Sequence, residues 1–106
     1  MSRFMRIVVF FDLPVVTKKD RKIYAQFRKF LIKDGYDMLQ FSVYSRICNG
    51  EDGAKKHYAR LKDNLPKKGS IRCMKVTEKQ YESMEILVGK KTVRERKISA
   101  DQLSIF

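Results

Sequence analysis

The chain has little of what small metal-bound or disulfide-bonded domains need. Its 106 residues include two cysteines and one histidine. Cys48 and Cys73 do not form a Cys-x-x-Cys pair, and together with His57 they are too few for a structural zinc site. We expect both cysteines to be small core or edge residues in a reducing compartment. His57 is expected on a helix surface or at an interface. A catalytic role for it is disfavoured, because no nucleophile pattern accompanies it.

Long apolar runs are also missing. No stretch is long enough to span a bilayer, and the first strand-like segment lacks the small-residue cleavage site of a signal peptide. The sequence shows neither an internal repeat nor a low-complexity segment. A cytoplasmic location is therefore expected.

Acidic side chains are scarce. There are 12 of them against 24 Lys and Arg, which gives a net charge of +12. Residues 1–50 hold ten basic and four acidic side chains, and residues 51–106 hold fourteen and eight, so each half carries +6. The positive charge is therefore spread over the folded body and is not confined to one tail. A polyanion such as nucleic acid would relieve the repulsion between these positive charges. A generic basic surface is the alternative; an acidic membrane is disfavoured, because no lipid anchor accompanies the charge.

The apolar pattern of the first half predicts a strand, a helix and a β region. Residues 4–11 are nearly all apolar or β-branched, which suits a strand buried on both faces, and Pro14 ends it. Thr17 and Asp20 resemble a capping box that opens a helix, and Gly35 closes that helix. Residues 36–47 alternate with period two. The pattern alone does not decide between one long bent strand and two strands.

A second helix is expected after Asn49-Gly50, followed by a strand at 71–76, a helical turn at 77–81 and a short strand at 84–88. The apolar face of that second helix is expected to consist of Ala54, Tyr58, Leu61 and Leu65. We expect a domain over residues 1–89 and a basic tail over 90–106. The end of that tail, 103–106, is expected to dock on another protomer or protein.

This order predicts an α+β fold, a ferredoxin-like βαββαβ unit with two helices on one face of an antiparallel sheet. The extra C-terminal strand needs an edge to pair with, and the other face of the sheet is free. Both features favour a homodimer.

Asp12 stands apart from the other acidic residues because it directly follows the buried strand. Six others are interpreted as helix or turn charges: Asp20, Asp34, Glu51, Asp52, Asp63 and Glu78. Asp12 is itself a turn former before Leu-Pro, and one carboxylate is a poor metal site. A two-fold axis that brought Asp12 of both protomers together would create a plausible Mg²⁺ site.

An RNA-recognition motif shares the same order of elements. It needs exposed aromatics in a glycine-containing pattern on its inner strands. The nearest segment, residues 40–44, lacks the glycine and the leading basic residue, which disfavours that interpretation.

Five stretches together resemble the CRISPR-associated Cas-two family, the smaller of the two core adaptation proteins. They are Arg6–Pro14, Arg28–Leu31, Gly35–Tyr36, Gln40–Tyr44 and Gly69–Arg72. The run Val76–Tyr81 and the length suggest the branch found in type II systems. The resemblance covers about residues 4–90.

The resemblance implies a ferredoxin-like homodimer whose last strand crosses to the partner, and it favours two strands in 36–47. It also implies an integrase partner, with which the dimer captures short duplex DNA and supports its insertion as new spacers. Some members are described as metal-dependent endoribonucleases or DNases with the aspartate at the end of strand one as metal ligand. Here that residue is Asp12, so the catalytic and Mg²⁺-binding role falls to it, with single-stranded RNA as a further substrate class.

Six lysines are candidates for sequence-independent phosphate contacts: Lys18, Lys19, Lys22, Lys67, Lys68 and Lys79. A solvated basic surface is the alternative for each. A toxin-like ribonuclease of the virulence-associated D type, which shares the fold and the dimer, is a further alternative function.

Overall fold

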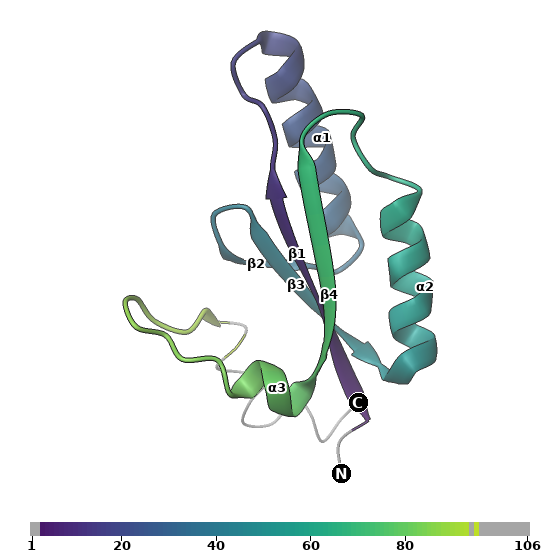
Figure 1. Ribbon diagram of the computed structural model, residues 1–106, viewed down its shortest axis with the longest axis vertical. Coiled ribbons are helices and arrows are strands. Elements are labelled where there is room, and N and C mark those ends of the chain that lie inside the picture. Colours follow the sequence, from purple (N-terminus) through teal and green to yellow (C-terminus); the bar gives the residue numbers. More distant parts are fainter. Residues whose placement is uncertain (1–2, 94, 96–106) are drawn as a thin grey trace.

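The computed structural model describes residues 3–93 and 95. It contains an antiparallel sheet with the strand order β2-β3-β1-β4, and the two long helices pack on one face of it (Figure 1). The elements in chain order are β1 (Phe4–Asp12), α1 (Lys18–Lys33), β2 (Asp37–Gln40), β3 (Val43–Asn49), α2 (Gly50–Lys62), β4 (Ser70–Thr77) and α3 (Glu78–Glu82). The predicted α+β class and the ferredoxin-like βαββαβ order are confirmed.

Strand β1 lies between β3 and β4 and pairs antiparallel with both. Its alternate side chains Ile7, Val9 and Phe11 belong to the core. Phe10 and Asp12 therefore point to the opposite face of the sheet, which we call the open face. The prediction of a central strand is confirmed.

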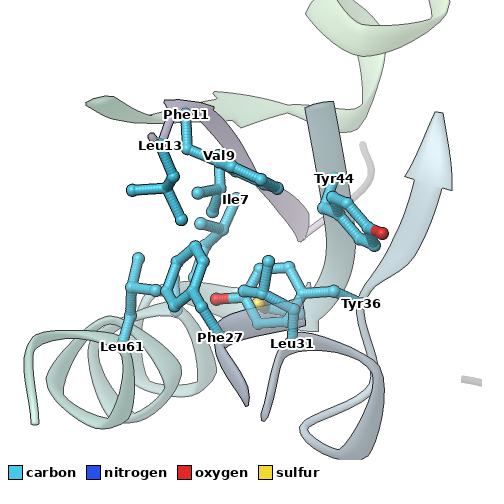
Figure 2. Close-up of a cluster of buried hydrophobic side chains, with 11 residues drawn as sticks. Ile7, Val9, Phe11, Leu13, Phe27, Leu31, Tyr36, Tyr44 and Leu61 are labelled. Atoms are coloured by element: carbon cyan, nitrogen blue, oxygen red, sulfur yellow. The ribbon is translucent and has the colours of Figure 1, made fainter. Parts of the chain in front are cut away.

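The core lies between the sheet and the two long helices. Figure 2 shows Val9 and Phe11 of β1 above Phe27 of α1, with Leu61 of α2 closing the cluster from the side. The ring of Phe11 meets that of Phe27 edge-on, with centroids 5.2 Å apart. Such pairs contribute about 0.5–1.5 kcal/mol beyond the area that they bury.

Local signals set the ends of α1. Thr17 accepts a hydrogen bond from the backbone N–H of Asp20, whose carboxylate accepts one from Thr17, so the predicted capping box is present. Gly35 follows the helix with a φ of 92°. A glycine is favoured there because side chains rarely tolerate a positive φ.

The region 36–47 forms two strands, β2 and β3, as the resemblance implied. They are joined at Phe41 and Ser42, and Ser42 has a φ of 65°. Phe41 is 78% exposed at this turn. The turn brings an aromatic side chain to the same end of the sheet as Asp12.

The apolar face predicted for the second helix is only half right. Ala54 and Leu61 are buried, but Tyr58 and Leu65 are 43% and 46% exposed. Leu65 lies beyond the end of α2 at Lys62. The helix is one turn shorter than its apolar pattern, and the turn before Pro66 takes Leu65 away from the core.

The strand expected at 84–88 is not formed in the single chain, where these residues have no regular secondary structure. A strand needs a second edge for its backbone hydrogen bonds, so pairing with another copy stays a prediction. Residue 94 and residues 96–106 lie outside the described part, which takes in most of the predicted tail 90–106 and the whole docking segment 103–106.

Candidate nucleic-acid interface

Asp12 is the last residue of β1, exposed on the open face. Its pairing partner across the sheet is Ser70, the first residue of β4. A shallow hollow of about 320 Å³ surrounds it, lined by segments of three strands. Its lining residues are Phe10, Phe11, Asp12, Phe41, Ser42, Val43, Ser70 and Arg72.

Two turns hold this hollow in place. The backbone N–H of Phe11 donates to the carbonyl of Ser42 at 3.1 Å, which fixes the β2–β3 turn beside β1. On the other side, a Cβ at Gly69 would lie 2.5 Å from Leu13 Cδ2 and 2.8 Å from the Asp12 carbonyl oxygen. Since Gly69 also has a φ of +95°, only glycine allows the turn before β4 to approach Asp12 so closely.

The donor set around Asp12 supplies only part of a metal site. In residues 3–93 and 95, no cluster of three or more His, Cys, Asp or Glu side chains is placed to hold a metal ion. One exposed carboxylate with two serine hydroxyls nearby is at the lower limit for Mg²⁺, which is usually held by one or two carboxylates together with waters and substrate phosphates. Asp12 of one chain therefore supplies only part of the ligand set that the implied Mg²⁺ would need.

The predicted lysines divide between two ends of the sheet. Lys18, Lys19 and Lys22 begin α1, directly after the loop that leaves β1 at Asp12. Lys67 and Lys68 lie in the turn before Ser70, which pairs with Asp12, and all five lysines are exposed. Figure 1 shows both segments at the upper end of the molecule.

Lys79 lies elsewhere. It belongs to α3, which follows Thr77, and Thr77 pairs with Met5 at the start of β1. The structure thus places Lys79 at the opposite end of the sheet from Asp12. In its place Arg72 of β4, which the sequence did not single out, lines the hollow.

The sequence model of a known family matches residues 5–84, and its description is "CRISPR associated protein Cas2". The chain belongs to this Cas2 family. A protein named "CRISPR-associated endoribonuclease Cas2" from Acidovorax ebreus (strain TPSY) is 58% identical, over 96% of this chain and 100% of its own length.

Further Cas2 relatives span most of the chain. Proteins of the same name from Flavobacterium psychrophilum and Campylobacter jejuni are 46% and 43% identical, over 98% and 99% of this chain and over 90% and 73% of their own lengths. A solved structure described as "Crystal structure of cas2" aligns with a TM-score of 0.49 and 14% identity, covering 85% of this chain and 92% of that one. Of the helices that the structure describes, none is long and apolar enough to cross a membrane.

The stretches that carry the Cas2 resemblance converge in space. The end of Arg6–Pro14, the turn in Gln40–Tyr44 and the start of β4 in Gly69–Arg72 all border the hollow at Asp12. The stretch Arg28–Leu31 on α1 contacts one of these segments, because Arg28 Nε donates a hydrogen bond to Tyr44 Oη at 2.8 Å. The candidate interface is thus the meeting point of segments distant in sequence.

Two buried polar clusters escaped the sequence reasoning. Arg6 and Glu78, 72 positions apart, form a two-point ion pair at 2.8 and 2.9 Å with side chains 6% and 5% exposed. The Arg6 guanidinium lies over the Tyr81 ring, 4.0 Å from its centroid. Glu78 does lie in the first turn of a helix, as expected, but the sequence did not show that it is buried and paired with a residue on a distant strand.

The second cluster corrects the expectation for His57, which is buried at 6% exposure rather than on a helix surface. Its Nδ1 lies 3.0 Å from Asp34 Oδ2, and Arg60 donates to Asp34 Oδ1 at 2.9 Å. Burial lowers the pKa of His57, opposed by the hydrogen bond to Asp34. Burial alone would raise the pKa of Asp34, but hydrogen bonds from His57 and Arg60 lower it. This cluster joins α1 to α2 and is structural.

Proposed function

We propose that this Cas2-family chain is a dimeric nucleic-acid-binding scaffold in CRISPR adaptation. Together with the integrase subunit, two copies would hold short duplex DNA while it is inserted as a new spacer. The observation that carries this proposal is the exposed basic end of the sheet, where Lys18, Lys19, Lys67 and Lys68 lie at the same end as Asp12 on a body of net charge +12. Phosphate contacts of this kind position a duplex without reading its sequence.

The open face supports the dimer. A groove of about 710 Å³ lies between that face and residues 84–90, with Val8, Phe10 and Met74 on its floor. In the covering segment Leu87 and Val88 are 88% and 94% exposed. Contiguous apolar surface of this kind marks an interaction site, and a second copy would bury it while giving residues 84–88 a strand edge.

A charge-reversal experiment tests the basic end. We expect the double variant Lys18→Glu/Lys19→Glu to weaken duplex binding and to reduce the slope of log K against log salt by about two for each copy that contacts the duplex, or about four for the dimer, since each phosphate contact contributes about 0.9. The matched control is Lys29→Glu/Lys33→Glu, which changes the net charge equally on the same helix but away from Asp12. Fluorescence anisotropy at several salt concentrations measures both. Equal weakening by the two variants would show a diffuse charge effect and no interface.

A magnesium-dependent endonuclease or endoribonuclease is the second candidate function. Asp12 favours it, being exposed beside Arg72 and the hydroxyls of Ser42 and Ser70, and the relatives above carry the name endoribonuclease. Asp12 of both copies would hold the ion, whose chemistry is to stabilise charge on the phosphate. Arg72 would orient a phosphate of the strand. Membership of the Cas2 family favours either CRISPR role over the toxin-like ribonuclease.

The variant Asp12→Asn separates the two functions. We expect it to abolish Mg²⁺-dependent cleavage of single-stranded RNA or DNA, while duplex binding and integrase-dependent spacer insertion persist. Asp63→Asn, an exposed position at the end of α2, is the matched control. Cleavage that survives in Asp12→Asn would assign it to another site. Loss of insertion in that variant would instead make Asp12 essential to the scaffold function.

A further inference from the structure

A second groove lies on the other side of the molecule, between α2 and the edge strand β4. It has a volume of about 300 Å³. Its floor is formed by Ile7 and Cys73 of the sheet, and its helix wall by Ala54, Tyr58 and Ala59. The groove exists because small side chains, two alanines and a cysteine, stand where larger apolar residues would fill the space between helix and strand.

The rim of this groove is positively charged. Lys55 and Lys62 reach it from α2 and Lys75 from β4. Lys62 Nζ lies 4.8 Å from the centroid of the Tyr58 ring, so this cation sits against the aromatic wall. Lys75 is paired with Glu51 at 2.6 Å, which leaves a surplus of two positive charges among these four side chains.

The groove therefore combines an apolar interior with hydrogen-bond donors at its mouth. Lysine side chains only donate, so the polar part of a ligand must be an acceptor and is favoured if it is anionic. Burial raises the pKa of the Cys73 thiol, and a neutral thiol on the floor does not repel an anion. The volume falls at the lower limit of small-molecule pockets, about 300 Å³.

We propose that this groove binds a mononucleotide unit, with its flat base against Tyr58 and the apolar floor and its phosphate between Lys55 and Lys62. The unit is a free nucleoside monophosphate or the 5′-phosphorylated terminal nucleotide of a strand. A volume of about 300 Å³ is in the range of small-molecule sites. The site lies on the helix-covered side of the sheet, so it depends neither on Asp12 nor on the proposed dimer.

Calorimetric titration of the full chain with AMP tests the proposal, with adenosine as the ligand that lacks the phosphate. We expect AMP to bind and adenosine to bind at least about tenfold more weakly, since charged hydrogen bonds contribute about that factor. Two variants should each weaken AMP binding by about tenfold or more: Lys55→Glu, which removes a phosphate contact, and Ala59→Leu, which fills the groove from an exposed helix position. Lys56→Glu is the matched control, because it is exposed on the same helix and does not line the groove.

A short single-stranded oligonucleotide with a 5′-phosphate, compared with the same strand bearing a 5′-hydroxyl, distinguishes the sources. Tighter binding of the phosphorylated strand that disappears in Ala59→Leu assigns the groove to strand ends. Equal binding of both strands together with AMP binding assigns it to the free nucleotide. The proposal is overturned if AMP does not bind, if Lys56→Glu weakens AMP as much as Lys55→Glu does, or if Ala59→Leu, with an unchanged circular dichroism spectrum, leaves AMP binding intact.

Discussion

The buried pair Arg6–Glu78 gives the sharpest quantitative prediction. Glu78→Ala removes both charge-assisted hydrogen bonds, at 2.8 and 2.9 Å, and leaves the guanidinium of Arg6 at 6% exposure without its hydrogen-bonded counter-charge. Leaving one member of a buried pair unmatched costs about 3–5 kcal/mol. The carboxylate of Glu95 also acts electrostatically on Arg6 and remains in the variant, so we expect a loss near the lower end, about 3 kcal/mol.

Urea unfolding followed by circular dichroism measures this loss at fixed protein concentration. For a domain of this size, about 3 kcal/mol corresponds to a fall in Tm of about 12 °C or more. Glu82→Ala, an exposed position on the same short helix, is the control and should change stability by less than about 0.5 kcal/mol.

The double variant Arg6→Met/Glu78→Met completes the test. Replacing a buried ion pair by apolar side chains of similar volume is often neutral, so we expect the double variant to be more stable than Glu78→Ala alone. A loss below about 1 kcal/mol for Glu78→Ala, or a double variant less stable than that single one, would refute the reasoning that an unmatched buried charge dominates.

Three further predictions concern other parts of the chain. Because the pKa of His57 is lowered in the folded state, the unfolded chain binds the proton on this residue more readily than the folded chain does. Stability should therefore fall as the pH drops below about 6.5. The difference between the urea midpoints at about pH 7.5 and 5.5 should be smaller in His57→Gln than in the wild type. Gly69→Ala should destabilise the chain by more than about 1 kcal/mol in the same assay, since the new Cβ meets Leu13 and the backbone of Asp12; an unchanged midpoint would contradict this. Thr17→Ala should cost about 1 kcal/mol through loss of the cap of α1, whereas Thr17→Ser should restore most of it.

Much of the fold is predictable because its signals are local. The capping boxes at Thr17 and Thr77 and the positive φ of Gly35 lie within a few residues of the features that they specify. The near-continuous apolar run of residues 4–11 identifies a central strand, and Asp12 stands out because it directly follows that run. The division of 36–47 into two strands needed the family resemblance, because the turn at Phe41 and Ser42 contains neither glycine nor proline.

The two buried polar clusters and the place of Arg72 depend on pairs distant in sequence. Arg6 and Glu78 are 72 positions apart and His57 and Asp34 are 23 apart, and no periodicity encodes which charges meet inside a fold. Likewise, Arg72 joins the hollow only through the register in which it lies opposite Phe10. A sequence supplies candidates for a site, while the strand register decides which of them share it.

The strict alternation along β1 also limits how this chain can change in length. Arg6 and Phe10 face one side of the sheet, while Ile7 and Phe11 face the other. Deleting or inserting one residue between Arg6 and Asp12 would reverse every side chain beyond the change, driving the carboxylate of Asp12 into the core and a core aromatic out of it. Side chains in the loop from Leu13 to Thr17 do not alternate between the two faces of the sheet. Insertions and deletions are therefore tolerable in this loop and not in the strand. Indel scanning of this segment should therefore show a sharp boundary at Asp12.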